Sequence, residues 1–165
     1  MVRVLLFDLD GVTAGRISRA DWVRQVGEMA GSAPAAEEWG VQPAVVDDAL
    51  LELSDDIRCS ELRTAVLTNG TDTISAEIAA LGIADRFDAI FNSADIGFVK
   101  PDVRAFKHAL RDLAVAAEEV FFTDDSESKL AGADSLSMRT HLFEGIDDLR
   151  DHLIKAGIEV SRPPF

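Results

Sequence analysis

The chain has 165 residues, of which 47% are hydrophobic and 28% are charged. This composition is typical of one soluble globular domain with a buried core, and it excludes an intrinsically disordered chain. The formal net charge of −14 argues against non-specific binding to nucleic acid or anionic membranes, because both need a basic surface. An anionic substrate meets a repulsive average field, so a local positive centre is needed to bind it.

Cysteine usage and hydropathy favour a cytoplasmic protein. The single cysteine, Cys59, cannot form an internal disulfide, which fits a reducing compartment. We expect it to be a partly buried structural thiol. The apolar run from Val2 to Phe7 is too short for a signal peptide. No stretch approaches the roughly 18 apolar residues of a membrane span.

Five apolar runs predict buried strands, over residues 2–7, 64–68, 88–91, 120–123 and 138–143. Their near-continuous apolar character is typical of strands buried on both faces of a parallel sheet. Helical apolar patterns alternate with them over 74–81, from beyond Pro101 to 113, and from 146 to about 157. This alternation predicts an α/β fold with a doubly wound parallel sheet, and one domain over residues 1–165.

Residues 13–63 interrupt the alternation. A helical apolar face is formed by Trp22, Val23, Val26 and Met29, and a second helix is predicted over about 43–53. We interpret about 14–42 as a short helical insertion after the first strand. Its apolar face packs either on the rest of the same molecule or on a second copy. The large apolar side chains of Trp22 and Trp39 favour the second alternative, a homodimer.

The first strand ends in the sequence Asp8-Leu9-Asp10-Gly11. Because strand side chains alternate, Asp8 and Asp10 are expected to point into one site. Two close carboxylates repel each other unless a cation lies between them or one is protonated. We therefore predict that Asp8 is a nucleophile and a metal ligand, and that Asp10 is a general acid and base with a raised pKa.

Two further motifs suit a phosphate group. Thr68, followed by Asn69 and Gly70, offers a hydroxyl and backbone amides at the end of the second strand. Lys100, before Pro101 and predicted to open a helix, offers a point charge. Taken singly, Thr68 is an ordinary turn residue and Lys100 a solvated lysine. Their joint order with the acidic motifs makes a phosphate-binding role the stronger interpretation.

A second acidic pair, Asp124-Asp125, ends another apolar strand. Its alternative role is capping of the helix that follows. Ligands of open α/β sheets gather outside the carboxyl ends of the strands, where all these motifs fall. Oxygen donors there suit a hard divalent cation, so the motifs together predict metal-assisted phosphoryl transfer. Three other Asp-Asp pairs, at 47–48, 55–56 and 147–148, are interpreted as parts of solvated faces.

With these motifs the chain resembles the haloacid dehalogenase-like hydrolase superfamily, of the phosphatase type, over residues 2–12 and about 64–155. The resemblance implies a Rossmann-like core and a Mg²⁺-dependent phosphatase or phosphomutase. It implies that Asp8 is transiently phosphorylated and that Asp10 protonates the leaving group and activates water. Metal ligands would be Asp8, Asp10 through its backbone carbonyl, and Asp125, with Asp124 as an accessory acid. Thr68 and Lys100 would hold the phosphoryl group, and we expect Asn69, next to Thr68, to contribute to phosphate binding.

Two features depart from the family pattern. Lys129 lies one helical turn beyond Asp125, where many relatives carry Asp or Asn near the metal. The insertion at about 14–42 is also too short for the usual four-helix cap. We predict hydrolysis of a small phosphate monoester, such as a sugar phosphate, beneath a reduced cap. The alternatives are a catalytically weak binding or regulatory protein and a phosphomutase.

Overall fold

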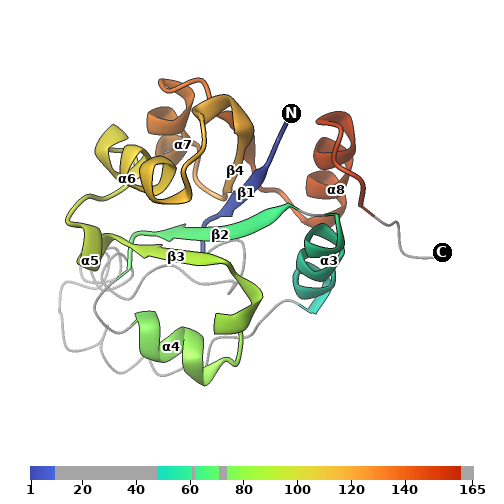
Figure 1. Cartoon of the computed structure of the whole chain (residues 1–165), viewed down its shortest axis with the longest axis horizontal. Helices are drawn as coiled ribbons and strands as arrows, with labels where there is room; N and C mark the ends of the chain where they lie inside the picture. Colours follow the sequence, from blue (N-terminus) through green and yellow to red (C-terminus); the bar gives the residue numbers. More distant parts are fainter. Residues whose placement is uncertain (10–47, 61, 71–73, 161–165) are drawn as a thin grey trace, which may run out of the picture.

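A computed structural model of the chain describes residues 1–9, 48–60, 62–70 and 74–160 (Figure 1). Five parallel strands form one sheet in the order β3-β2-β1-β4-β5. The strands are β1 (Val4–Phe7), β2 (Arg63–Thr68), β3 (Ala89–Asn92), β4 (Val120–Asp124) and β5 (Arg139–Leu142). All five predicted strands are confirmed, and β1 lies at the centre of the sheet. The prediction that all five are buried is wrong for β5, because Arg139 and Leu142 of this edge strand are exposed.

Helices cover both faces of this sheet (Figure 1). One face is covered by α5 (Ser93–Ile96), α6 (Val103–Leu113) and α7 (Glu127–Asp134). The other is covered by α3 (Asp48–Cys59), α4 (Ile74–Ala80) and α8 (Ile146–Lys155). The doubly wound, Rossmann-like α/β fold is therefore confirmed. Two short 3₁₀ turns, Ala84–Arg86 and Ala117–Glu119, precede β3 and β4.

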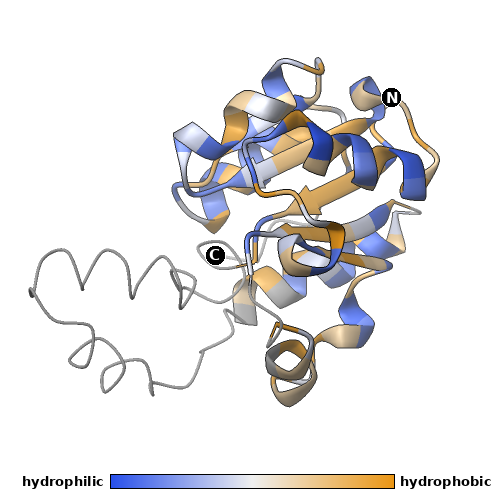
Figure 2. Ribbon diagram, turned by 90° about the vertical axis from the view of Figure 1, so that its left-hand side faces the viewer, coloured by the Kyte–Doolittle hydropathy of each residue, from blue (hydrophilic) through white to orange (hydrophobic). Residues whose placement is uncertain are grey.

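The strands β1, β2 and β4 are buried because both of their faces contact helices. In Figure 2 the central strands are largely hydrophobic in colour, whereas the helices around them include hydrophilic stretches. Along β4, Phe122 packs towards α6 and α7, and its neighbour Phe121 packs towards α3 and α8. Phe106 of α6 meets the Phe122 ring edge-on, with 5.2 Å between centroids. Alternate side chains of one strand thus belong to two separate cores.

Some predicted details of the helices are wrong. The helix predicted over about 43–53 runs on to Cys59 in α3, and Cys59 is exposed rather than partly buried. The buried face of α3 is formed by Leu50, Leu53 and Ile57 at helical spacing, and Cys59 falls outside this stripe. Asp148 is partly exposed, as expected for a solvated face, and it also contacts the buried His141, which was not predicted.

The predicted insertion at about 14–42, with Trp22 and Trp39, lies outside the described residues. Asp10 also lies outside them. Within the described ranges, no helix is both long and apolar enough to span a membrane.

A close contact between α7 and the Lys100–Pro101 turn gives a test of the packing. A Cβ atom at Gly132 would overlap the carbonyl oxygen of Pro101 and approach Cε2 of Phe106 to 2.7 Å. We expect Gly132→Ala to lower the free energy of unfolding by about 1–3 kcal/mol, because overpacking outweighs the helix preference of alanine. Urea denaturation measures the change.

The control is the reverse exchange at the exposed neighbouring position, Ala131→Gly. Helix propensity alone predicts that the free energy of unfolding rises in Gly132→Ala and falls in Ala131→Gly, by at most about 1 kcal/mol each. The clash predicts that both variants are destabilised. A Gly132→Ala protein more stable than the wild type would contradict the packing described here.

Candidate active site

The functional side chains gather at the carboxyl edge of the sheet because three neighbouring strands end there together. Asp8 directly follows β1, Thr68 ends β2, and Asp124 ends β4. The register pairs Phe7 of β1 with Val66 of β2 and with Thr123 of β4. The parallel strands therefore bring residues far apart in the sequence to one place, as predicted.

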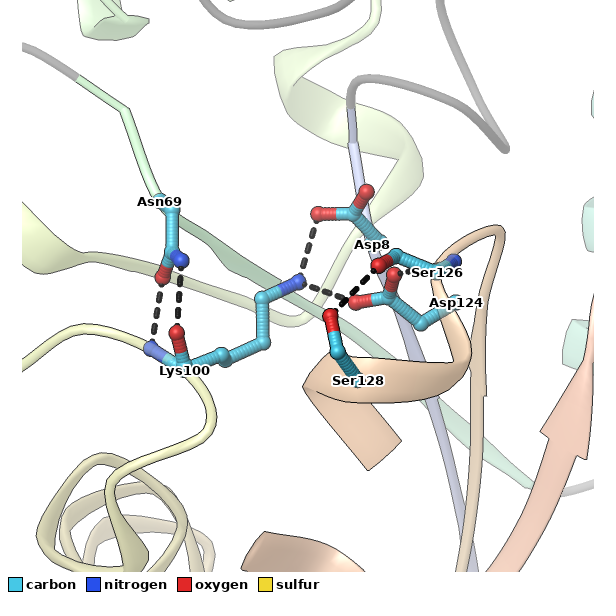
Figure 3. Close-up of polar contacts among 6 residues, drawn as sticks. All are labelled: Asp8, Asn69, Lys100, Asp124, Ser126 and Ser128. Atoms are coloured by element: carbon cyan, nitrogen blue, oxygen red, sulfur yellow. Dashed lines mark hydrogen bonds and ion pairs between the residues drawn. The ribbon is translucent and has the colours of Figure 1, made fainter. Parts of the chain in front are cut away.

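A buried ion pair connects these strand ends (Figure 3). The Lys100 ammonium lies 2.6 Å from Oδ1 of Asp8 and 2.7 Å from Oδ2 of Asp124. All three side chains are at most 1% exposed. One ammonium between two carboxylates offsets part of the cost of burying them. The site then carries a formal charge of −1 when both carboxylates are ionised.

Lys100 does not open a helix, which corrects the prediction made from its position before Pro101. A short helix, α5, follows β3, and Lys100 lies in the turn between α5 and α6. The α6 helix begins three residues later, where Asp102 accepts a hydrogen bond from the Arg104 backbone N–H. Lys100 is also 3% exposed, so it is not a solvated lysine.

Asn69 holds this turn through both halves of its side-chain amide (Figure 3). Its Oδ1 accepts from the backbone N–H of Lys100 at 2.7 Å, and its Nδ2 donates to the Lys100 carbonyl at 2.9 Å. The amide therefore pairs with the main chain of Lys100 as a neighbouring strand would. The sequence predicts Asn69 near the phosphate, but its position beside Thr68 gives no sign of this positioning role.

Asp124 serves the ion pair and the next helix at once. Its Oδ2 accepts from Lys100, and its Oδ1 accepts from the Ser126 backbone N–H at 2.9 Å, at the start of α7. Burial raises the pKa of Asp124, and the Lys100 charge only partly opposes this rise. The capping alternative and the site role are therefore both present. An acidic residue three positions before the first residue of a helix is the sequence signal for the Ser126 contact.

Two buried atoms of the site have no hydrogen-bond partner among the described residues. They are Oδ2 of Asp8 and the hydroxyl oxygen of Thr68. Buried polar atoms are rarely left unpaired in a folded protein. In a site of this kind, such atoms are available to a ligand.

The acidic groups fit a divalent cation. Asp8, Asp124 and Asp125 each offer a carboxylate oxygen, and these oxygens lie within 4.8 Å of one another. Asp125 is exposed, whereas the other two are buried, so the cluster opens to solvent on one side. Carboxylates, water and phosphate oxygens are the ligands that Mg²⁺ prefers. Lys129 lies on α7, half-buried, one turn beyond Asp125.

Comparison with known proteins gives the class of the chain. A model of haloacid dehalogenase-like hydrolases matches residues 14–136. The chain therefore belongs to the haloacid dehalogenase-like hydrolase family, as the motifs indicated.

The relatives match different shares of the chain. It is 31% identical over 110 residues to a glyceraldehyde 3-phosphate phosphatase of Methanothermobacter thermautotrophicus, which covers 64% of this chain and 49% of that protein. It is 40% identical over 76 residues to a drimenol cyclase of Aspergillus calidoustus, which covers 44% and 14%. The chain thus spans half or less of the length of these curated relatives.

Solved structures share the fold. One is a member of the same family from Bacteroides thetaiotaomicron in complex with magnesium and inorganic phosphate. Its TM-score is 0.66 at 20% identity, over 86% of this chain and 93% of that one.

The Asn69 contacts lead to a test of how the lysine is positioned. We expect Asn69→Ala to lower the free energy of unfolding by about 1–3 kcal/mol, since two hydrogen bonds worth about 0.5–1.5 kcal/mol each are lost. Asn69→Asp should be at least as destabilising, because it sets a carboxylate oxygen against the Lys100 carbonyl. Chemical denaturation of both variants measures this. Wild-type stability in both would show that Asn69 does not hold the lysine turn.

Proposed function

We propose that the protein is a Mg²⁺-dependent hydrolase of a small phosphate monoester, such as a sugar phosphate, acting through a phosphorylated Asp8. The observation that supports this most is the buried Lys100 between Asp8 and Asp124 at the carboxyl edge of the sheet. It combines a carboxylate with one unpaired oxygen and a fixed positive charge. Membership of the hydrolase family and the phosphatase relative point the same way.

In the first step, a carboxylate oxygen of Asp8 attacks phosphorus and the bond from phosphorus to the ester oxygen breaks. The lysine contact fixes the orientation of Asp8, so its unpaired oxygen is held ready for attack or for the metal. The Lys100 ammonium offsets the negative charge that gathers around the transferred group. The product of this step is an acyl phosphate on Asp8.

Asp10 is proposed to donate the proton that the departing alkoxide needs. In the second step it takes a proton from water as the water attacks phosphorus, and the bond from phosphorus to Asp8 breaks. Inorganic phosphate leaves, and both carboxylates return to their starting states. This role rests on the position of Asp10 two residues after Asp8, in the same strand-end motif.

The phosphoryl group is proposed to bind to Thr68, Asn69 and Lys100. The Thr68 hydroxyl supports this because it is buried without a partner among the described residues. Magnesium, when bound, would offset the negative charges of the carboxylates and of the phosphoryl oxygens. Asp8, Asp124 and Asp125 would hold it, with the Asp10 carbonyl. A reduced cap at about 14–42 and a homodimer remain part of this proposal.

The first functional test is Asp8→Asn. We expect it to abolish Mg²⁺-dependent phosphate release from an aryl phosphate, because an amide is a poor nucleophile, while circular dichroism shows an intact fold. The control is Asp85→Asn, the same change of charge at an exposed position, which should leave the rate unchanged. Full activity of Asp8→Asn would refute the covalent mechanism.

The wild-type rate also separates the alternatives. A phosphomutase would release phosphate slowly and would respond to a phosphorylated donor. A binding or regulatory protein would release none under any of these conditions.

The second functional test concerns the metal. We expect exhaustive chelation to stop turnover and added Mg²⁺ to restore it. Asp125→Ala should raise the Mg²⁺ concentration for half-maximal rate at least about tenfold, because a ligand of a hard cation is lost. Lys129→Asn should leave that concentration unchanged or lower it. Activity that survives chelation would contradict a metal-dependent reaction.

A further inference from the structure

A second cluster of ligand-type side chains lies on the opposite face of the sheet from Asp8 and Asp124. It consists of His141 on β5 with Asp148 and His152 on α8, the helix at the far face from α6 and α7 (Figure 1). Asp148 and His152 are four residues apart, so they share one side of α8. The proposed hydrolysis uses none of these three residues.

The cluster is compact. Nε2 of His141 lies 2.9 Å from Oδ2 of Asp148, and Nδ1 of His152 lies 3.4 Å from Oδ1 of the same carboxylate. The same Nδ1 lies 3.0 Å from the backbone carbonyl oxygen of Asp148, which only accepts, so an ion bound at Nδ1 needs the other tautomer of His152. The two imidazole rings are 4.5 Å apart between centroids. One ligand atom from each residue lies within 4.8 Å of the others. Donor atoms around a tetrahedral Zn²⁺ with bonds of about 2.0–2.1 Å are about 3.4 Å apart.

We propose that His141, Asp148 and His152 form a binding site for a divalent transition-metal ion of the zinc type. Two imidazoles and one carboxylate match the ligands of such ions, whereas Mg²⁺ prefers oxygen alone. Three protein ligands leave a fourth position for water. Asp148 and His152 are 41% and 44% exposed, so an ion can reach them from solvent.

The contact of His141 with β4 supports this assignment. Its Nδ1 lies 2.9 Å from the hydroxyl oxygen of Thr123, which is fully buried. A hydrogen bond to the second ring nitrogen is the usual way in which proteins orient a ligating histidine. Burial also lowers the pKa of His141, although Asp148 opposes this, so the neutral ring that binds metal is favoured.

Metal binding requires a change of tautomer at His141. Without metal, Nε2 faces an ionised carboxylate, which only accepts, so the neutral ring carries its proton on Nε2. A bound ion needs the lone pair of Nε2. The proton then lies on Nδ1 and is donated to Thr123, whose hydroxyl turns from donor to acceptor. The ring keeps one proton throughout.

The remaining histidine of the chain provides a matched control. His108 lies on α6 with Asp112 four residues further on, and the two side chains are 3.4 Å apart. This pair has the helical spacing of Asp148 and His152, but it belongs to no group of three ligands in the part of the chain that the structure describes. His108 should therefore not bind the ion.

The test is a Zn²⁺ titration of ¹⁵N-labelled protein, followed through the ring nitrogens of the three histidines. It is run with saturating Mg²⁺ to occupy the acidic cluster, and in a Cys59→Ser background because Cys59 is an exposed thiol. We expect His141 and His152 to shift together at one equivalent, with His141 changing from the Nε2–H to the Nδ1–H tautomer. His108 should not change, and the melting temperature should rise with zinc concentration.

Substitutions are made at the two partly exposed ligands, because a change at the buried His141 could disturb the core. Asp148→Asn and His152→Gln should each weaken zinc binding at least about tenfold, and His108→Gln should not weaken it. No tautomer change at His141 in excess zinc would overturn the proposal, and the cluster would then be a polar contact between β5 and α8. Equal shifts of all three histidines would overturn it as well, because they indicate unspecific binding.

Discussion

The candidate active site depends on one buried ammonium shared by two buried carboxylates. Without Lys100, Asp8 and Asp124 would be two like charges in the interior, a costly arrangement. The lysine comes from a turn between α5 and α6, and the carboxylates come from β1 and β4. The ion pair therefore links β1 and β4 to the turn between α5 and α6, which is not part of the sheet. The ion pair lies at the carboxyl ends of the strands, where ligands of open α/β sheets bind.

The sheet keeps two chemistries apart by the alternation of its side chains. Asp124 follows Phe122 on the face towards α6 and α7, and Thr123 follows Phe121 on the face towards α8. On the first face Asp124 contacts Lys100, and on the second face Thr123 contacts His141. Two neighbouring residues of β4 thus contact an acidic site suited to hard ions and a histidine cluster suited to softer ones.

Much of this could be predicted from sequence, since β1, β2 and β4 are buried and their sequences are nearly continuous apolar runs. The polar residues after these runs, Asp8, Thr68 and Asp124, meet because parallel strands end at one edge. Local pattern could not place Lys100, whose surroundings depend on contacts with residues 31 and 92 positions away. The contact between His141 and Asp148 was also missed, because an acidic pair on a helix gives no sign of its tertiary partner.

Within the part of the chain that the structure describes, the amide of Asn69 binds main-chain atoms of Lys100 alone. Asn69 therefore helps to specify the position of residue 100, whereas the side chain at 100 specifies the charge that is placed there. Replacing the side chain at 100 alters the charge of the centre while both anchoring contacts persist. Replacing Asn69 leaves the charge in the sequence but removes its anchor. The charge at residue 100 and the anchor of its main chain can therefore be altered by separate substitutions.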